Sequence, residues 1–176
     1  MAWQQLIEDI FILISQEMER ILEGLTVDDL NQQPRPDCNS IGWLAWHLTR
    51  SQDRMIEDLT GEEQTWTRDK WYLKFNRSSD ATETGVHHSS EEVIAFRSPD
   101  IATVMEYHHA VLEQTRRYVS TQLSEDELDR LFANPAFPHR RTPRERLMGV
   151  INDNLQHVGQ AAYVRGLLKG KGWSDR

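Results

Sequence analysis

The sequence of 176 residues contains a single cysteine, Cys38, and no long apolar run. One cysteine excludes an intrachain disulfide and a zinc site built from several cysteines, so any bound metal must be held by histidine and carboxylate side chains. No window approaches the roughly 18 consecutive apolar residues of a membrane span, and the N-terminus lacks the small-residue cleavage site of a secretory leader. We therefore expect a cytoplasmic protein with no membrane partner.

Positive charge is also scarce. The chain has 20 Lys and Arg residues against 28 Asp and Glu residues, which gives a net charge of -8. Non-specific nucleic-acid binding depends on cationic groups that displace counterions from phosphates, so a nucleic-acid partner is not expected. Apolar residues make up 38% and charged residues 27%, a balance typical of globular proteins, and the length suits one domain over residues 1–176. A small-molecule substrate is the expected partner.

Apolar residues recur at spacings of three and four in four long segments, which predicts four long helices. The segments run over 2–25, from 39 or 40 to 59, from 98 through 119, and from 142 to 168 or 169. Capping residues such as Ser40 and Thr142 open them, and Gly61 and Gly170 stop two of them. Short helical pieces are expected at 26–29, at 90–93 and at 124–131. With no alternating strand pattern, the fold class is all-α, a four-helix bundle with short extra helices in its connections.

The connections include one long irregular segment, residues 61–97, in which tryptophans and charges are mixed. So long a connection is uncommon unless it covers something, so we expect a lid or specificity loop. His87 and His88 lie in its polar part and are expected to be solvated. A second loop, residues 134–141, contains two prolines.

Asp153 and His157 are four residues apart and therefore lie on one face of the last long helix. His47, in the middle of another strongly apolar helix, is the best candidate for a third ligand. Two imidazoles and one carboxylate leave coordination positions open for water or substrate, as catalytic sites do. These ligands suit zinc, nickel or iron, and such an ion lowers the pKa of a water or thiol that it binds.

The sequence also resembles a known family in three places. These are Trp46-His47-Leu48, the run from His157 to Gln160, and the ending Tyr163-Val164-Arg165-Gly166-Leu167 with Gly172-Trp173. Together they resemble the DinB-like superfamily, which includes mycothiol-dependent maleylpyruvate isomerases and bacillithiol transferases. The resemblance implies a DinB-type bundle in which a helix-two histidine and a later H-x-x-x-H pair bind one divalent metal. His47 matches the first ligand and His157 the last, whereas Asp153 stands where many members have histidine; the isomerase branch has a carboxylate there.

The resemblance implies a metal-dependent thiol S-transferase or isomerase with a low-molecular-weight thiol as co-substrate. The alternatives are a metal-dependent hydrolase and a non-catalytic metal-binding or stress-related bundle. Whether Asp153 reaches the ion directly or through water stays open. A homodimer is implied by the family, and the tryptophans outside the helix stripes are candidates for its interface: Trp3, Trp66, Trp71 and Trp173.

Five further residues are candidates for binding substrate: Trp43, Arg50, His108, Gln160 and Tyr163. Four of them also have a structural interpretation. Trp43 and His108 are alternatively core residues. Arg50 is alternatively a surface ion-pair partner, and Gln160 a hydrogen-bonding residue in helix packing.

Overall fold

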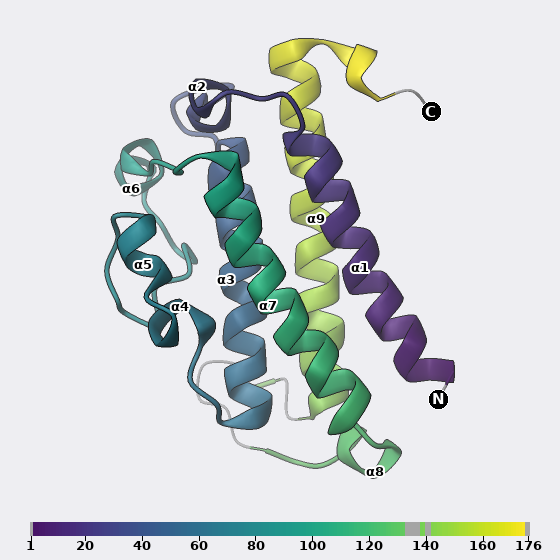
Figure 1. Cartoon of the computed structure of the whole chain (residues 1–176). Helices are drawn as coiled ribbons and strands as arrows, with labels where there is room; N and C mark the ends of the chain where they lie inside the picture. The colour runs from purple at the N-terminus through teal and green to yellow at the C-terminus, as the bar shows by residue number, and fades with distance from the viewer. Residues whose placement is uncertain (1, 133–137, 140–141, 175–176) are drawn as a thin grey trace.

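The computed structural model describes residues 2–132, 138–139 and 142–174, so most of the expected loop at 134–141 lies outside the described residues. Four long helices form a bundle, and no strand occurs in the described part of the chain, which confirms the all-α prediction (Figure 1). The long helices are α1 (Ala2–Leu22), α3 (Ile41–Thr60), α7 (Ile101–Thr121) and α9 (Pro143–Lys169). The short ones are α2 (Val27–Asn31), α4 (Thr65–Arg68), α5 (Trp71–Lys74), α6 (Ser90–Ala95), α8 (Glu125–Leu128) and the 3-10 turn η1 (Lys171–Trp173). Among the described residues, none of these helices combines the length and apolar character needed to cross a membrane.

Most helix ends follow the expected capping chemistry. The Ser40 hydroxyl accepts a hydrogen bond from the Trp43 amide at the start of α3, and Gly61 ends that helix in the left-handed conformation with φ 73°. Thr142 opens α9 through a capping box. Helix α7 begins later than predicted, because Asp100, not Ser98, provides its cap. The amide of Ser98 instead donates to the Asn31 side chain at 2.7 Å, which holds Ser98 in the preceding connection.

The bundle has an up-down-down-up arrangement. Helix α1 packs on α7 and α9, and α3 packs on the same two helices, so the four stand in the cyclic order α1, α7, α3, α9. In Figure 1, α3 and α7 run in the same direction while α9 runs antiparallel to α3. The connection between the parallel helices α3 and α7 must therefore return along the bundle, and it passes over the outer side of α3.

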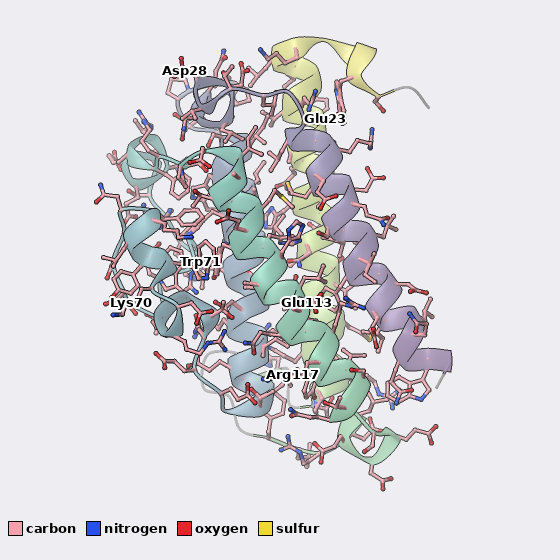
Figure 2. The ribbon with its side chains drawn as sticks, in the orientation of Figure 1. Glu23, Asp28, Lys70, Trp71, Glu113 and Arg117 are labelled. Atoms are coloured by element: carbon pink, nitrogen blue, oxygen red, sulfur yellow. The ribbon has the colours of Figure 1, made fainter. Side chains whose placement is uncertain are left out.

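Two of the tryptophans expected at an interface belong to the chain's own core. Trp66 is 0% exposed and Trp71 is 8% exposed, and both rings pack on Tyr107 of α7. Trp71 lies on α5, at the edge of the bundle, while charged residues such as Arg117 cover the exposed face of α7 (Figure 2). These aromatic side chains attach the long connection to the bundle, so the interface prediction was wrong for Trp66 and Trp71.

The buried face of α1 does not include every apolar residue of the helix. Leu6 and Leu13 are 62% and 50% exposed, whereas Phe11 is buried with Ile14 and Met18. The helix packs mainly on α7 and α9, so a narrow apolar stripe is enough to cover the core.

Candidate metal centre

Three side chains from two antiparallel helices converge on one point. His47 comes from α3, and Asp153 and His157 come from consecutive turns of α9. One ligand atom from each lies within 4.8 Å of the other two. The Nε2 atom of His47 is 3.9 Å from Asp153 Oδ2, and that of His157 is 3.4 Å from Asp153 Oδ1. The structure thus brings together the three residues that the sequence hypothesis combined.

The orientation of His47 is determined by a backbone carbonyl. Its Nδ1 atom lies 2.5 Å from the Thr84 carbonyl oxygen. A carbonyl can only accept, so the Nδ1 atom carries the proton and Nε2 keeps its lone pair directed at Asp153. The indole of Trp43 stacks on the imidazole with ring centroids 4.6 Å apart and an interplanar angle of 13°. His47 is therefore held on one edge and on one face.

His157 is oriented in the same way by a side-chain amide. Its Nδ1 atom donates to the Gln160 carbonyl oxygen at 2.8 Å, so Nε2 is the ring nitrogen that faces Asp153. The two imidazole rings meet edge to face, with centroids 4.7 Å apart. Hydrogen bonds of this kind, in which the second ring nitrogen donates to an oxygen, orient metal-binding histidines in proteins.

The charges of the three groups suit a cation. Burial and the neighbouring His157 lower the pKa of His47, so this ring is neutral at pH 7. The pKa of Asp153 is lowered, because hydrogen bonding and charge from His157 outweigh the effect of burial. Burial opposes a charge on His157 too, but its hydrogen bonds with Asp153 and Gln160 raise its pKa. Once a metal ion displaces the Nε2 proton of His157, the group offers two imidazole nitrogens and one ionised carboxylate.

The spacing of these atoms fits a divalent ion. Ligands about 2.1 Å from a tetrahedral zinc ion are about 3.4 Å from one another. The distance from His157 to Asp153 Oδ1 is 3.4 Å, that from His47 to Asp153 Oδ2 is 3.9 Å, and one ligand atom of each residue lies within 4.8 Å of the other two, so side-chain rotations would bring the three atoms to this spacing. The Asp153 side chain is 36% exposed whereas His47 is 6% exposed, so the open side of the site faces solvent along α9.

The long connection holds His47 in place through residues 78–89, which we call the strap. The Arg50 guanidinium, 0% exposed, donates to the carbonyl oxygens of Ala81 and Glu83 at 3.0 and 3.2 Å. Arg50 also lies 3.5 Å from Asp53. It is therefore neither a surface ion-pair partner nor an exposed binding residue, but a buried anchor of the strap. The expected lid is a segment packed tightly over α3.

Gly85 lets the strap approach the site. Its φ is +87°, and a Cβ atom at this position would lie 2.8 Å from ring carbons of both Trp43 and Trp46 and 3.3 Å from His47 Nδ1. Only glycine combines this conformation with so close an approach. The position was missed in the sequence analysis, although a glycine within a polar run is a signal for it.

His88 is not the solvated residue that the sequence suggested. The Trp43 indole N–H donates to its Nδ1 atom at 3.1 Å, and its Nε2 atom lies 2.9 Å from a Glu83 carboxylate oxygen. Glu83 in turn accepts two hydrogen bonds from Arg77. His88 therefore supports Trp43, which supports His47. His87, by contrast, is exposed as expected.

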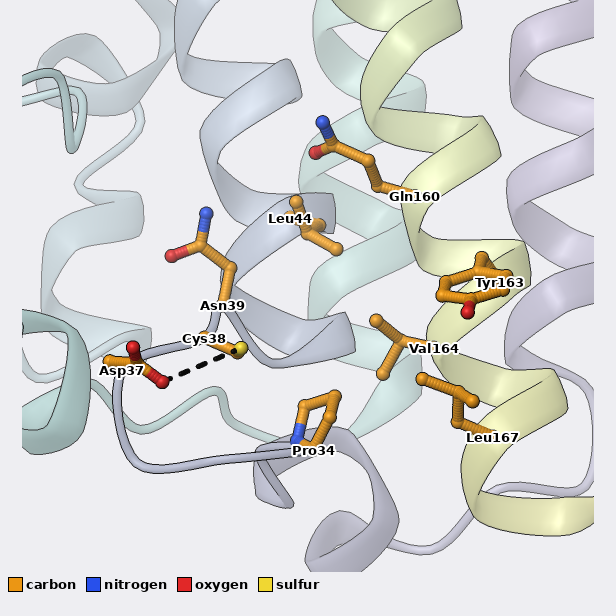
Figure 3. A pocket seen from close by; sticks show the side chains of 9 residues that line it. All are labelled: Pro34, Asp37, Cys38, Asn39, Leu44, Gln160, Tyr163, Val164 and Leu167. Carbon is orange, nitrogen blue, oxygen red and sulfur yellow. Dashed lines mark hydrogen bonds between the residues drawn. The ribbon is translucent and has the colours of Figure 1, made fainter.

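A largely apolar cavity of about 390 Å³ lies beside the site, between α9 and the segment before α3 (Figure 3). Gln160 and Tyr163 line it from α9, so both candidate substrate-binding residues face one cavity, and Gln160 also contacts His157. Tyr163 is 69% exposed and half-buried Cys38 lies across the cavity from it. The cavity is suited to an apolar substituent of a ligand held at the three-residue group.

His108 is a core residue. It is 1% exposed, and its Nδ1 atom is 2.9 Å from the Thr49 hydroxyl oxygen. Burial lowers its pKa to about 4. Trp43 is likewise buried, at 5% exposed, although it contacts His47 directly.

Comparisons with known proteins identify the family of this four-helix bundle. The chain belongs to the DinB superfamily, whose family model matches residues 12–161. It is similar to the crystal structure of a conserved protein from Enterococcus faecalis, with 31% sequence identity and a TM-score of 0.84 over 95% of this chain and 97% of that one. None of the curated proteins matches the sequence.

Proposed function

We propose that the protein binds one divalent metal ion through His47, Asp153 and His157 and acts as a metal-dependent thiol S-transferase or isomerase. One observation carries the metal site: both imidazoles have their Nδ1 atoms on carbonyl oxygens, and both direct their Nε2 atoms at one carboxylate. The three groups can share one cation, which is a proton on His157 in the metal-free protein and a metal ion that replaces this proton when the metal binds. Zinc and nickel are the metals we favour, with iron as the alternative.

When bound, the ion would supply Lewis acidity that lowers the pKa of a low-molecular-weight thiol and makes a thiolate available near neutral pH. The protein's own residues have the remaining tasks. Trp43 covers one face of His47 and excludes water from it. Gln160 fixes His157 and lines the apolar cavity with Tyr163, where the electrophile's apolar part would lie.

Both proposed reactions begin with attack by the thiol sulfur. In S-transfer, the sulfur forms a bond to an electrophilic carbon, the leaving group departs with the bonding electrons, and the thiol proton passes to solvent. In isomerisation, the sulfur adds to a conjugated double bond, rotation occurs about the resulting single bond, and elimination of the sulfur restores both the double bond and the thiol. Hydrolysis is supported less, because it needs a general base that takes a proton from the metal-bound water. The strap histidine His88 is not available for this task, since both of its ring nitrogens already have hydrogen-bond partners.

A second function, a metal that only stabilises the bundle, follows from the position of the site. His47 and the α9 residues join two antiparallel helices, so a bound ion would link α3 to α9. Metal binding to the folded state raises the melting temperature by mass action. If chelation lowers the melting temperature while no thiol consumes an electrophile, this function replaces the catalytic one.

Elemental analysis of tag-free protein tests the metal site. We expect about one divalent ion per chain in the wild type and its loss in His157→Ala. His109→Ala is the matched control, because His109 is an exposed histidine of α7 that pairs with Glu19. Turnover of 1-chloro-2,4-dinitrobenzene with mycothiol, bacillithiol or glutathione then tests the chemistry. Absence of stoichiometric metal, with no binding of added zinc or nickel, would refute the proposal.

A further inference from the structure

A second, smaller cavity of about 110 Å³ lies on the other side of the three-residue group. Asp153 itself forms part of its wall, with Ser51 and Arg54 from α3, Thr84 from the strap and Arg146 from α9. Pockets for whole ligands are usually about 300 Å³ or larger. This cavity therefore has room for one substituent of a ligand whose other end lies at the metal centre.

The helix geometry explains why two arginines line this cavity. Arg54 follows His47 by seven residues on α3, and Arg146 precedes Asp153 by seven residues on α9. Seven residues are about two turns, so each arginine lies on the same face as the ligand of its own helix, about 10 Å along the axis. Because α3 and α9 are antiparallel, both displacements point toward the same end of the bundle (Figure 1). Arg54 and Arg146 both line this cavity.

The charges of this cavity are complementary to an anion once a divalent ion is bound. Arg146 is 2% exposed and its Nε atom donates to Asp58 at 2.8 Å, which fixes the guanidinium in position. Arg54 is half-buried. Arginine remains protonated in proteins, so both groups keep their charge. The carboxylates near the two guanidinium groups include those of Asp58, Asp80 and Asp153, and a bound divalent ion would give these groups together a net positive charge.

We propose that this cavity binds a carboxylate of the substrate, with Arg54 and Arg146 as the residues that determine this specificity. The inference rests on the proposed metal function, since the ion holds the other end of the ligand. Guanidinium groups suit carboxylates because they donate two parallel hydrogen bonds in a plane. The Ser51 hydroxyl at the same wall is a further donor. The preferred substrates are thus small molecules with a carboxylate a few bonds from the group held at the metal centre.

Calorimetric titration of the zinc-loaded protein with succinate and with its monoamide succinamate, which carries one carboxylate, tests the inference. Both probes offer one carboxylate to the metal, and only succinate offers a second one to the arginines. We expect succinate to bind about tenfold more tightly, and Arg54→Gln to remove that preference while the affinity for succinamate stays the same. Arg146→Lys, which keeps the charge at the buried position, is expected to weaken the preference only in part.

Arg117→Gln on the exposed face of α7 is the control for loss of one positive charge. The zinc content of every variant is measured in parallel. Equal affinities for the two probes in a wild type that holds zinc, or a preference that survives Arg54→Gln, would overturn the carboxylate site and leave the metal centre standing. Failure to bind zinc would overturn the proposed function and this inference with it.

Discussion

The carbonyl oxygen of Thr84 lies 2.5 Å from Nδ1 of His47, although 37 residues separate the two in the sequence. This contact determines which imidazole nitrogen carries the proton and which one is directed at Asp153. The strap that provides the carbonyl is held by the buried Arg50 and approaches His47 through Gly85. The metal centre therefore depends on a segment that contributes no ligand of its own.

Gly85→Ala is expected to weaken zinc binding at least about tenfold and to destabilise the metal-free protein by about 1–3 kcal/mol. The reason is that a Cβ atom would press on Trp43, Trp46 and His47 in a left-handed conformation. Competition with a zinc chelator and urea unfolding measure the two effects. Gly24→Ala is the control, because Gly24 has φ +72° with nothing within 4 Å; it should leave zinc affinity unchanged. Equal zinc affinities in the two variants would show that the strap does not position His47.

Gln160→Leu is expected to reduce zinc affinity by about 10–100-fold, the usual effect of removing a hydrogen-bond partner of a metal-binding histidine. Gln160 is exposed, so the substitution should not change the free energy of unfolding of the metal-free protein. Gln156→Leu, one turn earlier and also exposed, is the matched control. An unchanged affinity in Gln160→Leu would mean that its contact with His157 does not orient the ring.

Asp153→Asn is expected to lower the pKa of His157 in the metal-free protein, because the carboxylate helps to raise that pKa. Titration of the imidazole protons by NMR measures it. Zinc affinity should also fall, since the amide lacks the negative charge. Asp126→Asn on α8 is an exposed control that removes the same charge. If zinc affinity stays at the wild-type value, Asp153 does not bind the ion directly.

His108→Gln is expected to make stability less dependent on pH. The folded state holds His108 neutral, with a pKa lowered to about 4 by burial, whereas the unfolded chain takes up a proton below about pH 6.5. Above about pH 6.5 the ring is neutral in both states and does not reduce the free energy of unfolding. As the pH falls toward 4, only the unfolded chain takes up the proton, so the free energy of unfolding decreases by up to roughly 3 kcal/mol. Urea unfolding at pH 7.5 and 4.5 should show a smaller loss for His108→Gln. Parallel losses in the two proteins would contradict the assignment.

Much of the bundle follows from local sequence patterns. Helix periodicity and capping residues act within a few residues of the chain, so α3 and α9 begin and end close to their predicted bounds. Asp153 and His157 were also predictable, because a spacing of four on one helix determines a shared face. The pairing of these two residues with His47 rested on the family resemblance and on the apolar helix around His47.

Other features were decided only by tertiary structure. A backbone carbonyl such as that of Thr84 is present at every residue, so no residue type marks the one that contacts His47. The burial of Arg50 and Trp66 depends on the path of the connection, and that path depends on α3 and α7 being parallel. Arg54 and Arg146 line one cavity because α3 and α9 pack antiparallel. The sequence by itself determined the helices and the ligand types, because both depend on near neighbours. The surroundings of the ligands depend on residues brought together from distant parts of the chain, and only packing decides which of these meet.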